Sequence, residues 1–492
     1  MKYFSTRDEQ KNKFDAAQVI KQGLATDGGL FVPEELPTIT ENDIDDLRKM
    51  TYSQRAAFVL SKFLTDYTYD ELLADCEAAY CDSSFNGGAA PLKKVTDNIF
   101  SLELWHGPTA AFKDMALQIM PRLLSRALIK TGEENTALIL VATSGDTGKA
   151  ALEGYKDIER IKIMVFYPAD GVSKVQKLQM ATQSGDNVNV CAIKGNFDDA
   201  QNGVKKIFSD TGAKEKLLKN GYILSSANSI NWGRLAPQIV YYISAYCDLL
   251  NNNEITYGET VNVCVPTGNF GNIFAAYIAK LMGVPLGKLV CASNSNNVLT
   301  EFLESGTYDR NRAFHLTMSP SMDILISSNL ERLLYFTSNA TETAKYMSAL
   351  AKDGKYTVSS DIKAKIDETF AGYYADEVET AKTLNKYFKE YGYLADTHTS
   401  VALNCAEKYI SASNDGKKMI VASTASPYKF AADVYKSITE NNAESGTEAL
   451  EQLSSLTNTE ITLPLRGLDK KEIRFSKVID ANDMLEEVYS FM

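Results

Sequence analysis

Histidine is scarce in this chain, and its cysteines show no paired spacing. Only His106, His315 and His398 occur among 492 residues, and the seven cysteines are scattered without a C-x-x-C pair. Zinc sites need closely spaced Cys and His ligands, and disulfide frameworks need an even number of cysteines. The sequence therefore argues against a zinc site and favours reduced, mostly buried thiols.

Long apolar runs and net positive charge are also absent. No stretch reaches the roughly 18 apolar residues of a membrane-spanning helix, and the opening M-K-Y-F-S-T-R-D-E-Q has no apolar core of a secretion signal. The formal net charge of -12 disfavours nucleic acid and anionic membranes as partners. We therefore expect a cytoplasmic protein with a small-molecule substrate, and a local pocket of donors if that substrate is anionic.

What the sequence does contain is an alternation of buried strands and helices. Apolar runs typical of strands buried on both faces span residues 136–143, 161–167, 188–193 and 261–265, and helical sequence follows each run. Such alternation is typical of a parallel sheet. The length leaves room for two or three domains.

One lysine stands out in the stretch W-H-G-P-T-A-A-F-K-D-M-A-L-Q. The pattern predicts a helix with Thr109 as its N-cap and Lys113 in its first turn. The helix dipole there disfavours an ammonium by about 0.3–1 kcal/mol, and burial beside Phe112 lowers the pKa further. An amine with a lowered pKa is the nucleophile that forms a Schiff base with a carbonyl cofactor. The alternative is a solvated surface lysine neutralised by Asp114.

A short glycine loop, S-G-D-T-G (144–148), separates the first of these strands from a helix. N–H groups at a helix start bind anions, and the hydroxyls of Ser144 and Thr147 add donors. We interpret the loop as a carboxylate or phosphate site. The alternative is a plain glycine turn capped by serine.

A second loop, P-T-G-N-F-G-N (266–272), has the composition of a phosphate cradle. No Asp or Glu occurs from Val261 to Thr300, where the chain average of 63 acidic residues in 492 would place about five. The dinucleotide fingerprint G-x-G-x-x-G and its acidic partner about 20 residues later are both missing. The loop therefore favours a bound phosphate over a nicotinamide cofactor.

Two further features complete the set. The stretch S-S-A-N-S-I-N-W-G-R-L-A-P-Q (225–238) places Arg234 beside amides at a helix start, which suits binding of a phosphate or carboxylate, or else is a polar loop with a side-chain cap. Thr424 follows a short strand and presents a hydroxyl toward a cleft.

Together with the lysine and the loops, these features indicate a pyridoxal phosphate enzyme. A hydroxyl opposite the ring nitrogen leaves the pyridine largely unprotonated, which favours β-elimination and β-replacement.

Short stretches in one order along the chain match a known family. They are Q-G-L-A-T-D-G-G-L-F-V-P (22–33), W-H-G-P-T-A-A-F-K-D-M-A-L-Q (105–118), A-T-S-G-D-T-G (142–148), N-S-I-N-W-G-R (228–234), P-T-G-N-F-G-N (266–272), T-M-S-P-S-M-D-I (317–324) and S-T-A-S-P (423–427). Through them the chain resembles the threonine synthase family, in the longer form found in bacteria and fungi. The resemblance covers nearly the whole length, and so many ordered matches are highly specific.

The resemblance implies an α/β fold of the tryptophan-synthase-β type (fold type II). We expect two parallel-sheet α/β domains with the cofactor cleft between them. The units would be an N-terminal unit (1–92), a large cofactor-binding domain (93–135 and 236–492, with a helical insertion at about 303–394) and a small α/β domain (136–235). The long form of the family favours a monomer.

The same resemblance implies a reaction and its residues. Pyridoxal 5'-phosphate would be the cofactor, and O-phospho-L-homoserine and water would give L-threonine and phosphate. Lys113 would bond to the cofactor and act as the base. The other implied residues are Gly268, Asn269, Phe270, Gly271 and Asn272 for the cofactor phosphate, Thr424 for the ring nitrogen, Ser144, Gly145, Asp146 and Thr147 for the substrate carboxylate, and by hypothesis Asn231, Arg234 and Lys174 for the substrate phosphate.

Some positions depart from the family pattern. Ser426 and Tyr428 stand where the family usually has His and Ala, and related enzymes of the fold have Asn where this chain has Asp146. A carboxylate would repel the phenolic oxygen of the cofactor, so we expect Asp146 to point elsewhere. His106 is interpreted as structural. Two alternatives stay open: a phospho-lyase that releases 2-oxobutyrate, and a non-catalytic phosphate- or nucleotide-binding protein.

Overall fold

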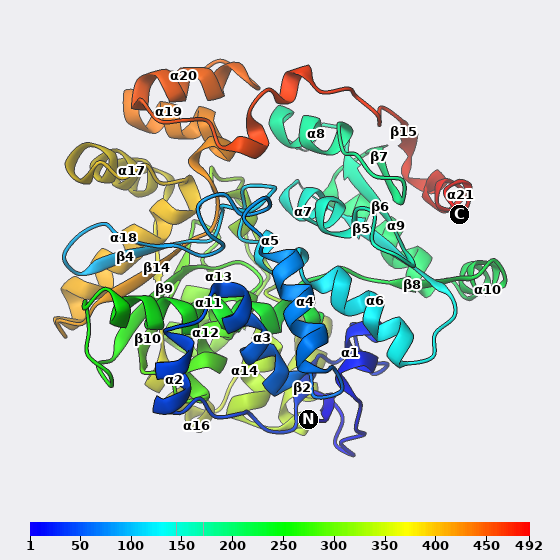
Figure 1. Ribbon diagram of the computed structural model, residues 1–492, viewed down its shortest axis with the longest axis horizontal. Coiled ribbons are helices and arrows are strands. Elements are labelled where there is room, and N and C mark those ends of the chain that lie inside the picture. The colour runs from blue at the N-terminus through cyan, green and yellow to red at the C-terminus, as the bar shows by residue number, and fades with distance from the viewer. Residues whose placement is uncertain (144, 171) are drawn as a thin grey trace.

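Two sheets organise the chain, whose computed structural model describes residues 1–143, 145–170 and 172–492 (Figure 1). The larger has six strands in the order β13-β10-β9-β14-β4-β3, and the smaller has five in the order β15-β7-β6-β5-β8. Among the described strands of both sheets, every pairing is parallel except that of β3 with β4. The strands are β3 (Leu92–Lys94), β4 (Ile99–Glu103), β9 (Val261–Pro266), β10 (Leu286–Ser293), β13 (Phe370–Tyr374) and β14 (Met419–Ser423) in the larger sheet, and β5 (Thr136–Ala142), β6 (Ile161–Pro168), β7 (Val188–Lys194), β8 (Tyr222–Ser225) and β15 (Val478–Asp480) in the smaller. The predicted α/β fold with two parallel-sheet domains is confirmed.

Helices cover both faces of the smaller sheet because its strands are apolar on both sides. Successive side chains of a strand point to opposite faces: Leu138 and Leu140 of β5 pack with the cluster on α9, α10 and α21, whereas Ile139 and Val141 join the main core with α7. These helices are α7 (Asp146–Tyr155), α8 (Lys174–Ala181), α9 (Phe197–Ser209), α10 (Thr211–Lys219) and α21 (Met484–Ser490).

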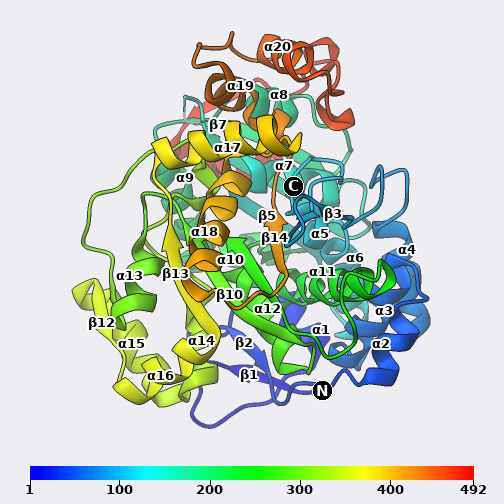
Figure 2. The same ribbon diagram turned by 90° about the vertical axis from the view of Figure 1, so that its left-hand side faces the viewer.

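The larger sheet follows the same rule. Cys264 and Val421 pack toward α18, which lies across the sheet in Figure 2, whereas Val263 and Ile420 face the main core with α11 and α12. The helices on this sheet are α11 (Trp232–Asn251), α12 (Gly271–Leu281), α13 (Val298–Ser305) and α18 (Thr397–Ser413). α19 (Ala431–Thr439) and α20 (Glu448–Thr457) pack against each other in a separate apolar cluster. Nowhere in the described ranges is a helix long and apolar enough to cross a membrane.

The N-terminal region packs into the core of the larger domain. Trp232 is fully buried, and the rings of Tyr3 and Phe63 each lie 5.6 Å from its ring. Arg332, also fully buried, donates from Nε to the Phe31 carbonyl oxygen at 3.0 Å. The elements here are β1 (Tyr3–Ser5), α1 (Ala16–Gln22), β2 (Phe31–Pro33), α2 (Glu41–Leu47), α3 (Tyr52–Phe63) and α4 (Tyr69–Ala79).

The region 303–394, predicted as a helical insertion, also contains strands. β13 lies parallel to β10 at the edge of the larger sheet. Its sequence, F-A-G-Y-Y, is too short for periodicity to distinguish it from the end of a helix. The remaining elements are β11 (Thr307–Asp309), α14 (Leu330–Thr337), α15 (Ala340–Asp353), β12 (Lys355–Thr357), α16 (Ser360–Thr369) and α17 (Glu377–Tyr391).

The C-terminal end of the chain crosses to the smaller sheet. β15 pairs with β7, and α21 packs on α9, as the red segment of Figure 1 shows. We propose the domain boundaries predicted above with one change, which moves residues 478–492 from the large to the small domain.

α7 of the smaller domain packs tightly on α5 (Asp114–Leu117), which carries the chain into α6 (Met120–Lys130). A Cβ on Gly154 would lie 1.8 Å from the Leu117 carbonyl oxygen. Gly154→Ala is therefore expected to lower the free energy of unfolding by about 1–3 kcal/mol, because backbone must move. Urea unfolding measures this.

The matched control is Gly212→Ala in α10, where the nearest atom to a new Cβ is Asp210 Oδ1 at 3.4 Å. Alanine is the better helix former, so stability should hold or rise by up to about 1 kcal/mol. Equal effects of the two substitutions would contradict the close packing of α7 on α5.

Candidate active site

The segment that carries Lys113 is tied to the end of β14. The Phe112 N–H donates to the Thr424 carbonyl oxygen at 2.8 Å, and the Ser426 N–H donates to the Ala110 carbonyl oxygen at 3.0 Å. These bonds bring Lys113 and Thr424 together, although they lie far apart in the sequence.

The helix predicted to start at Thr109 begins instead at Asp114, so that prediction is wrong. The N–H and hydroxyl of Thr109 donate to the buried Asp114 carboxylate at 2.8 and 2.7 Å, and Ala110 has a left-handed φ of 59°. Gly107 permits this turn, because a Cβ there would lie 2.6 Å from Asp114. Lys113 consequently occupies the N-cap of the short helix α5.

The Lys113 amine lies among buried charges. Its Nζ is 3.5 Å from Ser321 Oγ and 3.9 Å from Asp146 Oδ2. Burial, opposed by the attraction of Asp146 and reinforced by the repulsion of Lys429 and Arg234, lowers the pKa of Lys113 to about 8. Roughly a tenth of this amine is therefore uncharged at pH 7, as a nucleophile or base requires.

The first glycine loop follows β5 and opens α7, as predicted. The N–H groups of Gly145 and Gly148 both donate to Thr143 Oγ1 at 2.9 Å, and Gly145 has a φ of 140°. Thr147 is half-buried in the first turn of α7. Ser144, a predicted carboxylate ligand, lies outside the described residues.

Asp146 faces the site, so the expectation that it points elsewhere is wrong. Its Oδ2 faces Lys113, and its Oδ1 accepts from Lys429 Nζ at 2.8 Å and from Gln176 Nε2 at 2.9 Å. Burial opposes its ionisation, but Lys429 and Lys113 outweigh this and hold its pKa well below the usual range. Lys429 was missed in the sequence because nothing in S-T-A-S-P-Y-K-F showed that its lysine turns inward.

The second glycine loop presents unused hydrogen-bond donors. None of the backbone N–H groups of residues 268–271 donates to another described residue. Phe270, with a left-handed φ of 61°, caps α12. Asn272 Oδ1 accepts from the Tyr241 and Tyr242 hydroxyls at 2.7 and 2.5 Å, which leaves its buried Nδ2 without a partner among the described residues. Such a cluster of free donors suits an anion.

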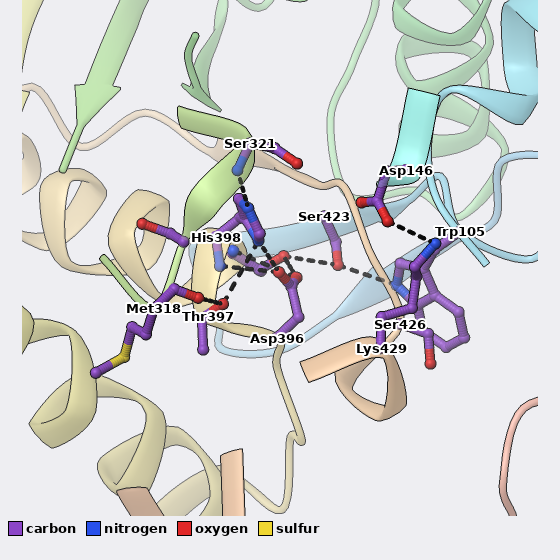
Figure 3. A network of polar contacts seen from close by, with 12 residues as sticks. Trp105, Asp146, Met318, Ser321, Asp396, Thr397, His398, Ser423, Ser426 and Lys429 are labelled. Carbon is purple, nitrogen blue, oxygen red and sulfur yellow. Dashed lines mark hydrogen bonds and ion pairs between the residues drawn. The ribbon is translucent and has the colours of Figure 1, made fainter. Parts of the chain in front are cut away.

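One turn, η1 (Pro320–Met322), separates the loop from the lysine. A Cβ on Gly268 would lie 2.7 Å from the Ser321 carbonyl oxygen, and Ser321 Oγ accepts from Lys113. The turn is held from behind, because the Ser321 N–H donates to His398 Nε2 at 3.1 Å and His398 Nδ1 lies 2.9 Å from Asp396 Oδ1 (Figure 3). The sequence reading missed His398 and Asp396, although the polar run D-T-H-T at the start of α18 was a visible signal.

Of the three residues proposed for the substrate phosphate, Arg234 keeps a side-chain hydrogen-bond donor without a partner among the described residues. It is buried, its Nη1 donates to the Ala227 carbonyl oxygen at 2.8 Å, and its Nε has no partner among the described residues. Burial lowers its pKa to about 10, so it stays a cation at neutral pH.

Two other candidates serve the structure instead. Asn231 caps α11 by accepting from the Gly233 N–H at 2.9 Å and donates to the Ile20 carbonyl oxygen at 2.9 Å. Lys174 is exposed and donates to Ser445 Oγ at 2.7 Å. The hydrogen-bonding groups of both side chains are therefore already occupied by other residues.

The departures from the family pattern anchor the C-terminal segment. Thr424 directly follows β14, as predicted, and it is buried. Beyond it, Ser426 Oγ lies 2.5 Å from Thr462 Oγ1, and Tyr428 OH lies 2.6 Å from Thr459 Oγ1. These contacts join the chain after α20 to η2 (Pro427–Phe430), the short turn that carries Lys429.

His106 has a local role, as interpreted from the sequence. Its Nδ1 lies 2.9 Å from the Asn86 carbonyl oxygen and its Nε2 lies 2.9 Å from Glu103 Oε2, while its ring stacks on Trp105. The ring thus links the loop at Asn86 to the end of β4.

Comparisons with known proteins cover nearly the whole chain. Three family profiles match: "Threonine synthase N terminus" at residues 2–80, "Pyridoxal-phosphate dependent enzyme" at residues 88–424 and "Threonine synthase, C-terminal" at residues 399–491. The threonine synthase of Pseudomonas aeruginosa is 38% identical over 442 residues, which are 89% of this chain and 90% of that protein.

This chain belongs to the threonine synthase family of pyridoxal-phosphate dependent enzymes.

Solved structures of the family share its fold. A pyridoxal-phosphate-bound threonine synthase from Brucella melitensis matches with a TM-score of 0.89 and 36% identity, covering 100% of this chain and 99% of that one. A yeast threonine synthase matches with a TM-score of 0.89 and 31% identity, covering 99% of this chain and 98% of that one.

Human threonine synthase-like 1 is 39% identical over 438 residues, and this chain spans 58% of its length.

The residues present in this member of the threonine synthase family fit the cofactor. A phosphate group needs several converging donors, and the free N–H groups of residues 268–271 together with Asn272 Nδ2 supply them. A cofactor carbonyl needs an uncharged amine, and Lys113 supplies one on the other side of η1.

The lowered pKa of Lys113 predicts a pH-dependent effect on stability. The pKa is about 8 in the folded chain and ordinarily 10.5, so the unfolded state binds more protons between these values. The cost of burying the ammonium is full below pH 8 and disappears as pH rises toward 10.5. In cofactor-free protein, Lys113→Met should raise the free energy of unfolding by about 1–3 kcal/mol at pH 7 and by less at pH 9.5.

Urea unfolding at the two pH values measures the difference. Lys205→Met, on the exposed face of α9, is the control and should show no such difference. An equal gain at both pH values for Lys113→Met would contradict the buried, weakly basic amine.

Proposed function

We propose that this protein is a threonine synthase that converts O-phospho-L-homoserine and water to L-threonine and phosphate with pyridoxal phosphate. The observation that carries the proposal is the placement of the Lys113 amine, with its lowered pKa, across one turn from a loop of free N–H donors. The family membership and the relatives named threonine synthase support it.

Three groups of residues would hold the cofactor. Lys113 would bond to its carbonyl carbon, the loop of residues 268–272 would bind its phosphate, and Thr424 would meet its ring nitrogen. The bound cofactor withdraws electrons from the α carbon of the substrate. A hydroxyl such as that of Thr424 accepts or donates one hydrogen bond without adding a charge.

Lys113 is the proposed base. Once the substrate amine has displaced it, its amine would take the α-proton and, after releasing it, a β-proton, and phosphate would leave from Cγ. One proton would then return to Cγ and one to Cα, and water would add its hydroxyl group at Cβ and give its remaining proton to the departing phosphate. Ser321 Oγ, which accepts from Lys113 Nζ, orients the amine between these two positions. The pKa near 8 suits a group that must both take and release protons at neutral pH.

The substrate carries two anionic groups, and the proposal gives each one a site. The N-terminus of α7 at Asp146 and Thr147 would supply N–H groups for the carboxylate, whereas the Gly145 N–H already donates to Thr143 Oγ1. Arg234, with its free Nε, binds the phosphate. We withdraw Asn231 and Lys174 from the phosphate site, because their side chains are already bonded elsewhere.

We also propose that the enzyme acts as a monomer in the cytoplasm. The support for a monomer is the resemblance to the long form of the family, and the support for the cytoplasm is the absence of paired spacing among the seven cysteines. Sedimentation of the holoprotein at micromolar concentration should give a single species of 54.3 kDa.

Product analysis tests the proposed function. Purified holoprotein given O-phospho-L-homoserine should form L-threonine and phosphate in equal amounts, and Lys113→Ala should lower kcat by at least about 100-fold, since it removes the general base. Release of 2-oxobutyrate without threonine would instead identify a phospho-lyase, and absence of phosphate release would reject the substrate.

Arg234→Met tests the phosphate site separately. Losing a charge-assisted bond should raise KM for O-phospho-L-homoserine by about tenfold or more. Arg310→Met, at the distant β11 end, is the control and should leave KM unchanged. An unchanged KM for Arg234→Met would remove Arg234 from the site.

A further inference from the structure

Three buried charged groups form a line beside the cofactor site. Lys429 Nζ lies 2.8 Å from Asp146 Oδ1, and Asp146 Oδ2 lies 3.9 Å from Lys113 Nζ. The side chain of Lys429 is fully buried and that of Asp146 is 4% exposed. Figure 3 shows Asp146 and Lys429 facing each other next to Trp105.

Two further hydrogen bonds hold Lys429 in place. Its Nζ also donates to the Thr109 carbonyl oxygen at 3.0 Å, and its backbone N–H donates to the Ser426 carbonyl oxygen at 3.0 Å. Thr109 belongs to the turn that precedes Lys113. Lys429 therefore clamps that turn and the start of α7 together through one ammonium group.

The charges that face Lys113 come from four elements. Asp146 on α7 and Asp114 on α5 attract its ammonium, whereas Lys429 on η2 and Arg234 on α11 repel it. The Asp114 carboxylate is occupied by the two donors of Thr109. Asp146 is thus the carboxylate whose partner decides how strongly Lys113 is held as a cation.

We propose that Lys429 is a positioning residue that engages the Asp146 carboxylate and so prevents it from pairing closely with Lys113. The ammonium of Lys429 binds one carboxylate oxygen at 2.8 Å and leaves Lys113 with a contact of 3.9 Å to the other oxygen. The inference rests on Lys113 being the reactive amine, as in the proposed function. It assigns Lys429 a role that no comparison gives it.

The two partners should shift the pKa of Lys113 in opposite directions. Without Lys429, the repulsion is lost and Asp146 is free to pair with Lys113, so the pKa of Lys113 should rise by about one unit or more. Without the Asp146 charge, the attraction is lost while Lys429 stays, so the pKa of Lys113 should fall. A merely structural role for Lys429 predicts no such pair of opposite signs.

The experiment is competitive labelling of lysines with acetic anhydride in the full-length, cofactor-free protein. Labelling of the peptide that contains Lys113 is followed by mass spectrometry across pH 6 to pH 11, which gives the midpoint for this lysine alone. The variants are Lys429→Gln, which removes the ammonium charge, Asp146→Asn and the double variant. Circular dichroism verifies that each is folded.

Lys149→Met is the matched control. Lys149 is a buried lysine on the same helix as Asp146, but it pairs with Glu153 at 2.8 Å. It should leave the midpoint of Lys113 where it is in the parent protein.

A higher midpoint in Lys429→Gln, a lower one in Asp146→Asn and an intermediate one in the double variant are expected. An unchanged or lower midpoint in Lys429→Gln would overturn the proposal, as would a shift of the same size in Lys149→Met. If Lys429→Gln does not fold, a midpoint in Asp146→Asn that equals or exceeds the parent value overturns the proposal by itself. The labelling uses no substrate, so a negative result would reject the role of Lys429 alone. The proposed reaction is tested separately by product analysis.

Discussion

Burial of a single amine sets the conditions for this site. Removing the Lys113 ammonium from water, together with repulsion by the neighbouring cations Lys429 and Arg234, lowers its pKa to about 8. Burying this ammonium lowers the stability of the fold. The lysine stays buried because several surrounding hydrogen bonds fix the segment that carries it. Asp114 accepts two hydrogen bonds that fold the turn before the lysine, the residues just after β14 bond to that turn, and Ser321 Oγ accepts from the amine.

The two domains contribute different parts of this arrangement. The larger sheet supplies Lys113, Thr424 and the loop at the start of α12, which all lie at the carboxyl ends of β4, β14 and β9. The smaller sheet supplies Asp146 at the carboxyl end of β5. Parallel strands place their carboxyl ends at one edge, so residues distant in sequence meet there. Lys429 and Asp146 join the two parts by one buried ion pair.

Much of this could be predicted from the sequence where a signal is local. The strands at 136–143 and 261–265 were visible as apolar runs, the cradle after the latter as a glycine loop without acids, and Lys113 as the one lysine in its stretch. The helix start at Asp114 could not be predicted, because it depends on the Asp114 carboxylate accepting from both Thr109 donors, which bends the chain. Lys429 and His398 were missed because their roles depend on contacts with Asp146 and Ser321, which lie far away in the sequence. β13 and β15 were missed because three to five residues carry too little periodicity.

The most direct test of the account is a crystal structure of this chain with pyridoxal phosphate. The account predicts a covalent bond between Lys113 Nζ and the cofactor, with the cofactor phosphate accepting from the N–H groups of residues 268–271 and from Asn272 Nδ2. A phosphate bound instead at the α7 loop of residues 145–147, or a cofactor attached to another lysine, would contradict it.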